Sequence, residues 1–291
     1  MTRCPQLRFA LLAALLSFAS AVHGAPTSDA DYAAKMQHEH QHDTTAPSPA
    51  ATIEPRQPVE GHEVTYGTLD GVALRGYVAH PAAGHAGLPG LIVIHEWWGL
   101  NDNVRAMTRR LAGEGYLALA VDLYGGRSAT TSDEATALIN AATKDPGKLM
   151  ANLRLAADHL RREERVPKLG VLGWCFGGGW SLQVALDLGA GIDAAVVYYG
   201  RTVSDPAELA KLKAPLLGLF GELDQGIPVA GVREMESALT KLGKRATIVV
   251  YPNASHAFAN PTGPRYQAEA AEDAWRRVTA FLAAELGAGA R

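Results

Sequence analysis

Residues 169–186 read "LGVLGWCFGGGWSLQVAL", and the stretch "GWCFGG" occupies positions 173–178 within them. One apolar run precedes this stretch and another follows it, so that Cys175 lies between glycines at the junction. The pattern Gly-x-Cys-x-Gly matches a nucleophile elbow, a sharp turn from a strand into a helix, with sulfur in place of the serine oxygen. Such a turn strains its central residue, and a Cβ at Gly173 or Gly177 would crowd it. We therefore predict a nucleophilic cysteine at the carboxyl end of a strand.

Working outward from this turn, strands alternate with helices. A hairpin is expected over 62–80, and continuous apolar runs, typical of buried parallel strands, follow it. Eight strands are expected in total: 62–67, 72–80, 90–96, 116–125, 168–174, 192–200, 214–224 and 246–253. Helices are expected between them: 101–116, 131–142, 147–164, 176–189, 228–242 and 266–286. This order predicts one α/β domain whose mostly parallel sheet is covered by helices on both faces.

The first 58 residues have a different composition. Arg3 and Arg8 precede a short apolar stretch and then small residues, as in a signal peptide, and we assign residues 1–25 to it. An uncleaved anchor is the alternative, although the apolar stretch is shorter than the roughly 20 residues that a membrane span needs. Residues 26–58 are poor in aliphatic side chains and are expected to be a disordered or loosely attached linker. The domain is expected over 59–291, and the protein is expected to be exported to a bacterial periplasm.

Charge and cysteine content limit the kinds of partner and cofactor. The net charge of −3 does not favour binding to nucleic acid or to an anionic membrane. Removal of the signal peptide leaves Cys175 as the single cysteine, which excludes an intramolecular disulfide. We expect no cofactor and no catalytic metal. The alternating histidines His38, His40 and His42 can bind a metal weakly, but a solvated tract is the alternative, because no second ligand cluster is visible in the sequence.

Three further reactive side chains follow expected strands. Glu96 follows the strand that begins at residue 90, Asp224 follows the strand near 215–220, and His256 follows the last strand. Because the carboxyl ends of parallel strands meet at one edge of the sheet, these side chains are expected near Cys175. His256 would then activate the sulfur and Asp224 would orient the imidazole. The backbone amides of Phe176 and Trp97 are the candidate oxyanion donors.

Four blocks give the chain a specific resemblance. They are "VIHEWWGLNDNVRAMTRRLAGEGYLALAVDLYGG", "GVLGWCFGG", "LFGELD" and "YPNASHAF", and in their order and spacing the chain resembles the dienelactone hydrolase family, over roughly residues 60–286. The resemblance implies the α/β-hydrolase fold and a catalytic triad of Cys175, Asp224 and His256. It also implies that the carboxylate of Glu96 takes the thiol proton when substrate binds. A carboxylate beside the thiolate and apolar tryptophans should have a raised pKa, which suits that role.

The chain also departs from the family pattern. Family members that act on the dienelactone hold its carboxylate with arginines, one of them soon after the catalytic histidine, where this chain has Asn260. Arg201 and Arg127 are the candidate substitutes, with surface positions as the alternative. Trp98 and, by family analogy, Tyr124 are the candidate pocket walls, and packing is the alternative for the tryptophan.

The sequence thus predicts a hydrolase, similar to carboxymethylenebutenolidase, that acts on a small ester or lactone through a thioester intermediate. A general carboxylesterase or thioesterase is one alternative. A catalytically inactive binding protein, associated with a metal through the histidine tract, is the other.

Overall fold

The computed structural model describes residues 29–41, 43 and 48–287, together with Met1. The signal peptide that the sequence predicts, and His42 of the histidine tract, lie outside these residues. Within the described part of the chain, no helix is both long enough and apolar enough to cross a membrane.

Eight strands form a single sheet, as expected. They are β1 (Val59–Leu69), β2 (Val72–Pro81), β3 (Gly90–Ile94), β4 (Leu117–Val121), β5 (Leu169–Trp174), β6 (Ala194–Tyr198), β7 (Leu216–Gly221) and β8 (Ala246–Tyr251). Their spatial order is β1-β2-β4-β3-β5-β6-β7-β8. β2 runs antiparallel to both β1 and β4, whereas all pairs from β4 to β8 are parallel. The sheet and its helices have the order and arrangement of the α/β-hydrolase fold.

Eight α-helices accompany the sheet in the described residues. They are α1 (Asp29–His40), α2 (Asp102–Gly113), α3 (Ser132–Thr143), α4 (Pro146–Asp158), α5 (Phe176–Leu188), α6 (Pro206–Leu209), α7 (Val229–Lys241) and α8 (Ala268–Leu286). Three single turns complete the structure: 3₁₀ turns at Pro49–Thr52 and Gly189–Gly191, and a π-turn at His159–Glu163.

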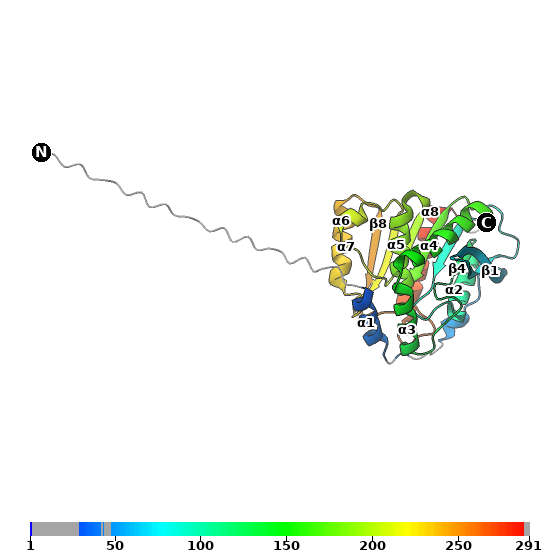
Figure 1. The fold of residues 1–291 in the computed structure, drawn as a ribbon, viewed down its shortest axis with the longest axis horizontal. Coiled ribbons are helices and arrows are strands. Elements are labelled where there is room, and N and C mark those ends of the chain that lie inside the picture. The colour runs from blue at the N-terminus through cyan, green and yellow to red at the C-terminus, as the bar shows by residue number, and fades with distance from the viewer. Residues whose placement is uncertain (2–28, 42, 44–47, 288–291) are drawn as a thin grey trace.

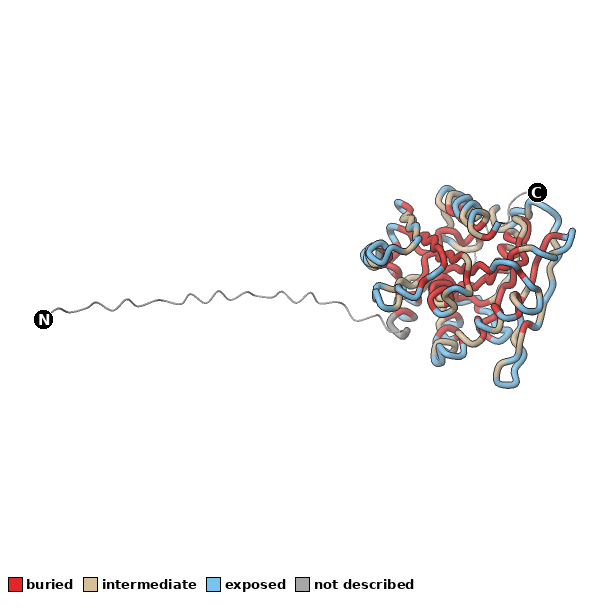
Figure 2. Tube along the Cα trace, turned by 90° about the horizontal axis from the view of Figure 1, so that it is seen from above, coloured by how far each residue is buried: buried red, intermediate tan, exposed pale blue. Residues whose placement is uncertain are grey.

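The helices form a layer on each face of the sheet (Figure 1). On one face, α2 and α8 lie side by side, with the guanidinium of Arg110 4.0 Å from the ring centroid of Trp275. On the other face, α4 and α5 are joined by an ion pair between Arg154 and Asp187. The strands between these layers are the most deeply buried part of the chain (Figure 2), and every residue of β3 to β7 is buried. This agrees with their continuous apolar sequences.

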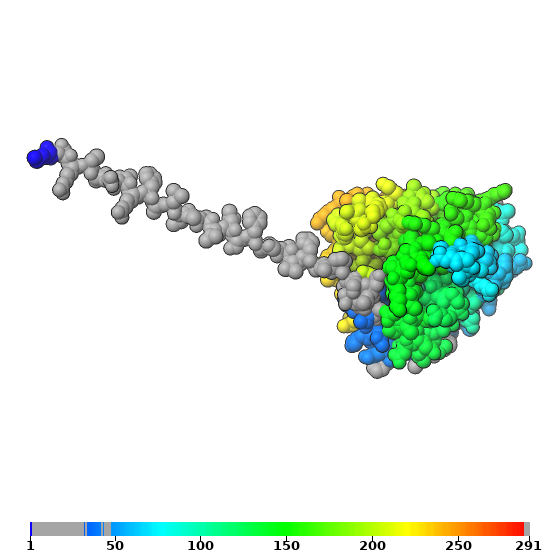
Figure 3. Space-filling view, in the orientation of Figure 1, coloured from blue at the N-terminus to red at the C-terminus, as the bar shows by residue number. Residues whose placement is uncertain are grey.

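The expectation of a disordered linker over 26–58 is wrong for residues 29–40. These residues form helix α1, which packs beside α3 at the surface of the domain (Figure 3). Tyr32, Met36 and His40 are buried beneath it. These three side chains recur every four residues, so they lie on one face of the helix. Low aliphatic content misled the prediction, because an aromatic ring, a thioether and an imidazole supply the buried face instead.

Candidate active site

Cys175 lies between the end of β5 and the start of α5, with φ 54° and ψ −117°. A non-glycine residue with positive φ is strained, and such strain is concentrated at functional sites. The backbone amide of Cys175 donates to the carbonyl oxygen of Tyr198 at 3.0 Å, which ties the turn to β6. The side chain of Cys175 is buried, and the thiol is free.

The glycines around Cys175 are required by close backbone contacts. A Cβ at Gly173 would collide with the backbone of Gly177, and a Cβ at Gly177 would collide with the carbonyl oxygen of Ile94. A Cβ at Gly178 would in turn meet the carbonyl oxygen of Tyr198. The turn and the first residues of α5 therefore lie directly against the sheet, as the glycine pattern predicts.

His256 and Asp224 meet near the sulfur, although 32 positions separate them in the sequence. His256 follows β8 and Asp224 follows β7, and Nδ1 of the imidazole lies 2.7 Å from Oδ2 of the carboxylate. The other carboxylate oxygen accepts a hydrogen bond from the amide of Ile227 at 2.7 Å. The nearby Glu222 is exposed and accepts from the amide of Asn253 instead. The imidazole is thus oriented by Asp224, which leaves its Nε2 available for chemistry.

The electrostatics of the site favour a thiolate beside an imidazolium. Burial disfavours the charged sulfur, but the nearby imidazoles of His256 and His40 outweigh it and lower the pKa of Cys175 to about 6. Burial opposes the charging of His256 as well. The Asp224 carboxylate and the Cys175 thiolate nevertheless raise its pKa well above the ordinary value. The two shifts reinforce each other, because each charge stabilises the other.

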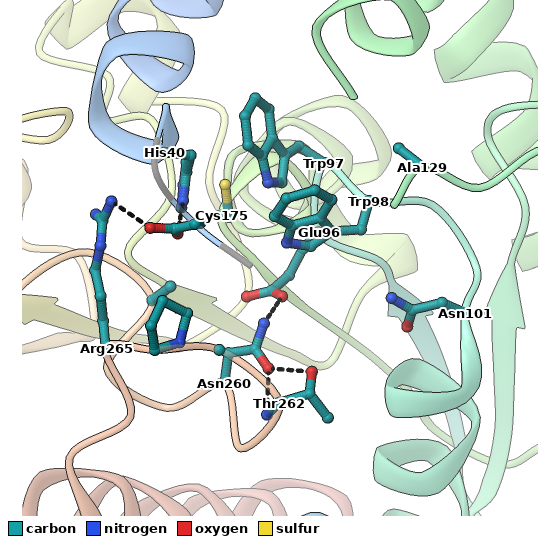
Figure 4. Close-up of a pocket in the computed structure, with 14 residues that line it drawn as sticks. His40, Glu96, Trp97, Trp98, Asn101, Ala129, Cys175, Asn260, Thr262 and Arg265 are labelled. Carbon is teal, nitrogen blue, oxygen red and sulfur yellow. Dashed lines mark hydrogen bonds and ion pairs between the residues drawn. The ribbon is translucent and has the colours of Figure 1, made fainter. Parts of the chain in front are cut away.

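Glu96 is buried a few residues beyond β3, on the same edge of the sheet. The hydroxyl of Tyr199 donates to its Oε1 at 3.3 Å, and Nδ2 of Asn260 donates to its Oε2 at 2.5 Å (Figure 4). Burial raises the pKa of Glu96 to about 7, and the negative charge of Cys175 adds to this shift. Its carboxylate is therefore a competent proton acceptor near neutral pH. Asn260, which stands where the family pattern has an arginine, holds this carboxylate.

The aromatic candidates surround the sulfur in different ways. Trp97 and Trp98 line the cavity beside Cys175, with ring centroids 4.9 Å apart. Phe176 begins α5 directly after Cys175, so its amide belongs to the first turn of the helix, where amides have no acceptor within the helix. Tyr124 is buried against Phe176, with ring centroids 5.8 Å apart, and does not line this cavity. The oxyanion role of the two amides remains a prediction.

The two candidate arginines lie away from the cavity. Arg127 is exposed and donates to the carbonyl oxygen of Tyr124 at 3.3 Å, and Arg201 packs beside Gly179. Neither contributes to the cavity wall, whereas Arg265, which the sequence argument did not consider, does. Arg265 lies nine residues beyond His256, in a loop whose course no local pattern predicts.

Helix α1 covers the sulfur of Cys175. The hydroxyl of Tyr32 lies 3.9 Å from the sulfur of Cys175, and the thioether sulfur of Met36 lies 4.0 Å from it. The ring of His40 stacks 4.6 Å from that of Trp97 and meets the ring of His256 edge-on at 5.1 Å. A segment expected to be a linker therefore forms one wall of the site.

Charged groups hold α1 in this position. Nδ1 of His40 pairs with Oδ2 of Asp43 at 2.5 Å. Arg265 bridges Glu39 at 2.5 Å and Asp43 at 2.9 Å. Burial opposes charging of His40, but the hydrogen bond to Asp43 raises its pKa overall. The end of α1 is thereby fastened to the loop that follows His256.

The cavity beside the sulfur is small. Its volume is about 30 Å³, which is enough for only a few water molecules. Its wall includes Glu96, Asn260 and Arg265 as well as Cys175 and His40. With α1 in place this volume is too small for an ester, so we expect α1 to move when a substrate binds.

The class of protein is an α/β hydrolase. It is defined by the eight-stranded sheet, by the buried sulfur on a strained turn, and by the histidine and carboxylate that follow later strands. Residues 74–286 match the model of the dienelactone hydrolase family. The chain therefore belongs to the dienelactone hydrolase family, and it is a hydrolase of carboxylic ester bonds.

Individual relatives agree with this assignment. The chain is 34% identical over 249 residues to a candidate carboxymethylenebutenolidase of Saccharolobus solfataricus, covering 73% of this chain and 95% of that protein. A candidate dienelactone hydrolase from Klebsiella pneumoniae has a similar crystal structure, with TM-score 0.70, 30% identity, and coverage of 78% of this chain and 99% of that one. The fold is also shared with a dienelactone hydrolase-like promiscuous phosphotriesterase from metagenomic libraries, with TM-score 0.71, 22% identity, and coverage of 78% and 99%.

Proposed function

We propose that the chain hydrolyses a small ester or lactone, with Cys175 as nucleophile, His256 as acid and base, and Asp224 as the residue that orients the imidazole. One observation carries this proposal: the strained Cys175 meets an imidazole whose Nδ1 is held 2.7 Å from Asp224 and whose Nε2 is free. The geometry has the three roles that covalent catalysis needs. Membership in a hydrolase family favours this reading over a catalytically inactive binding protein.

The reaction has two halves. The Cys175 thiolate attacks the carbonyl carbon, and the amides of Phe176 and Trp97 stabilise the oxyanion. The C–O bond of the ester then breaks, and the leaving alkoxide takes a proton from the imidazolium of His256, which leaves a thioester on the enzyme. In the second half, neutral His256 removes a proton from water, the water attacks the thioester, and the thiolate leaves with release of the carboxylic acid.

Glu96 is proposed to act before the first half. When the sulfur carries a proton in the resting enzyme, the Glu96 carboxylate accepts it as substrate enters. Its pKa of about 7 matches this task near neutral pH. The hydrogen bonds from Tyr199 and Asn260 hold the carboxylate in place for the transfer.

The substrate is proposed to be a small ester or lactone, because the chain belongs to the dienelactone hydrolase family and α1 restricts access to the sulfur. A panel of lactones, p-nitrophenyl esters and acyl thioesters of increasing size tests this. A lactone hydrolase gives its highest kcat/KM on the lactones, whereas a general carboxylesterase or thioesterase favours the other two groups. In each group, kcat/KM is expected to fall as the acyl chain lengthens.

The covalent step is tested by trapping the acyl-enzyme with a p-nitrophenyl ester and measuring the mass of the peptide that contains Cys175. Wild-type protein should carry the acyl group on this peptide, and Cys175→Ala should carry none and lose turnover. Asp224→Asn should lower kcat by about 10⁴, as expected for loss of the orienting acid. The matched control is Glu222→Gln, because Glu222 is a neighbouring acid outside the site. Undiminished turnover in Cys175→Ala would refute the proposal.

We also propose that the protein is exported and that residues 1–25 are removed. The basic residues, short apolar stretch and small residues at the start of the sequence support this. Expression of the full chain in a Gram-negative host, followed by fractionation and mass spectrometry of the N-terminal peptide, tests it. A mature N-terminus near residue 25 in the periplasmic fraction is expected, and an intact Met1 in the cytoplasm would contradict export.

A further inference from the structure

Two imidazoles, and not one, face the nucleophilic sulfur. One ring nitrogen of His40, one of His256 and the sulfur of Cys175 all lie within 4.8 Å of one another. The three side chains are only 2%, 0% and 1% exposed. Proposed catalysis uses Cys175 and His256 and leaves His40 unexplained.

The free nitrogen of each ring is identified by what the other nitrogen does. Nδ1 of His40 is held by Asp43, and Nδ1 of His256 is held by Asp224. Nε2 of both rings is buried, and among the described residues neither has a hydrogen-bond partner. A buried polar atom without a partner is unusual and points to a missing ligand. Here two such atoms flank the same sulfur.

A carboxylate on the far nitrogen of each imidazole is the arrangement found at metal sites. It fixes the tautomer, directs Nε2 at the ion and makes the nitrogen a stronger donor. Both His40 and His256 have it. Two imidazole nitrogens and one thiolate form a donor set that suits zinc, and soft sulfur ligands also select copper(I).

The dimensions also fit an ion. Donors around a tetrahedral zinc lie about 3.3 to 3.6 Å apart, as follows from zinc–nitrogen and zinc–sulfur bonds of about 2.0 to 2.3 Å. The three donors therefore need to close by at most about 1.5 Å, which small movements of α1 and the side chains supply. The thioether of Met36, 4.0 Å from the Cys175 sulfur, or a water from the cavity completes the set.

We propose that His40, Cys175 and His256 form a binding site for a zinc or copper(I) ion, and that the ion fastens α1 over the nucleophile. Binding places the thiolate lone pair and Nε2 of His256 on the metal, and every proton that the sulfur, Nε2 of His256 or Nε2 of His40 carried is released to solvent. Both groups are then unavailable to a substrate carbonyl. The ion is thus a reversible inhibitor and not a cofactor. The site itself rests on the donor geometry, and only the inhibition rests on the proposed hydrolysis.

Direct binding to the full chain, kept reduced and first freed of metal with a chelator, is the test. Calorimetry with Zn²⁺ should give one ion per chain. Co²⁺ should give a sulfur-to-cobalt charge-transfer band, which Cys175→Ser should lose. Asp43→Asn should weaken Zn²⁺ binding by about 10- to 100-fold, the usual effect of losing a carboxylate behind a ligand histidine. His40→Gln should weaken it further.

His38→Gln is the matched control, because His38 lies on the same helix two positions away but is exposed. It should bind Zn²⁺ as the wild type does. Equal losses in His38→Gln and His40→Gln would assign the metal to the exposed tract and overturn the buried site. Absence of saturable Zn²⁺ and copper(I) binding, or a cobalt band that survives in Cys175→Ser, would also overturn it.

A second arm distinguishes the two ions. Copper(I) affinity is measured by competition with a chromogenic chelator, in wild type and in Met36→Leu. Zn²⁺ affinity of Met36→Leu is measured by calorimetry as well. If Met36→Leu loses affinity for copper(I) but not for Zn²⁺, the thioether is a fourth donor and copper(I) is the preferred ion. If Met36→Leu keeps its affinity for both ions, water is the fourth ligand and zinc is favoured. Hydrolysis by the metal-free enzyme is measured separately, so a failure of the hydrolase proposal shows there and leaves the binding result intact.

Discussion

At the scale of the residue, Cys175 is held in a strained backbone conformation that directs its sulfur toward the imidazole of His256. A non-glycine residue with φ 54° is strained by about 1 to 3 kcal/mol, and the surrounding contacts must maintain it. Gly177 is part of that support, because its α-carbon lies against the carbonyl oxygen of Ile94 at the end of β3. Position and reactivity of the sulfur therefore depend on a residue with no side chain.

Gly177→Ala is predicted to destabilise the protein, because the new Cβ overlaps the Ile94 carbonyl and the backbone must shift. A loss of about 1 to 3 kcal/mol in the free energy of unfolding is expected from overpacking of this kind, measured by urea denaturation. Gly191→Ala is the control. Its Cβ would meet Leu188 at an ordinary 3.4 Å, so its effect should stay below about 1 kcal/mol. Equal effects of the two changes would contradict the steric account.

The lowered pKa of Cys175 predicts the pH dependence of its alkylation. Thiolate is the reactive form, so in the metal-free protein the iodoacetamide rate should be flat above neutrality and fall as pH drops through about 6. His256→Gln removes the main positive partner while burial remains, so its midpoint should move above the roughly 8.5 of an ordinary thiol. A wild-type rate that keeps rising to pH 9 would show that the sulfur is not activated.

At the scale of the element, α1 shows what a sequence can and cannot predict. The strands, and the grouping of Cys175, Asp224 and His256, follow from apolar runs and from residues placed just after them, because buried parallel strands leave a strong local signal. Docking of α1 is decided by contacts with residues more than 130 positions away, such as Cys175. The sequence does contain one sign of this helix, the four-residue spacing of Tyr32, Met36 and His40. The spacing indicates a buried helical face only if aromatic, thioether and imidazole side chains are counted as buried residues.

The cavity wall shows the same limit. Glu96 was expected beside Cys175 from its place after a strand, and it lines the same cavity. Arg265 comes from a loop whose path is set by tertiary packing, so no spacing rule indicated it, whereas Asn260 was noted only as a departure from the family pattern. The arginines chosen from the sequence, Arg201 and Arg127, follow strands as well, but their side chains lie outside the cavity wall.

Arg265→Gln is predicted to loosen α1. The substitution removes the partly buried ion pairs to Glu39 and Asp43. If the free energy of undocking α1 falls by about 1 kcal/mol, the population with α1 undocked rises about fivefold. The rate at which a bulky maleimide labels Cys175 should rise by about that factor. Arg233→Gln removes an exposed pair with Glu236 and should leave the rate unchanged. No difference between the two variants would mean that these pairs do not hold the helix.

At the scale of the whole molecule, the sheet order brings the ends of β3, β5, β7 and β8 to one edge, and α1 closes over that edge. An ion that joins His40 to Cys175 and His256 therefore connects the first helix to the centre of the domain. Ligands that bind only the folded state stabilise it in proportion to the logarithm of their concentration. The proposed site thus makes a prediction about global stability.

Zn²⁺ at about 100 times its dissociation constant should stabilise the protein by about 2.7 kcal/mol. For a domain of this size, the Tm should rise by about 5 to 10 °C in scanning calorimetry of the reduced protein. His38→Gln should show the same rise and His40→Gln should not. A rise of equal size in both variants would place the ion elsewhere.

The family match begins at residue 74, whereas α1 ends at residue 40. The part of the chain that shapes access to the sulfur is therefore encoded upstream of the part that makes it reactive. A change confined to the leading segment is therefore expected to alter which esters reach the sulfur while the sheet and the elbow that hold Cys175 stay the same. Replacing this segment is thus a direct way to change the selectivity of the enzyme.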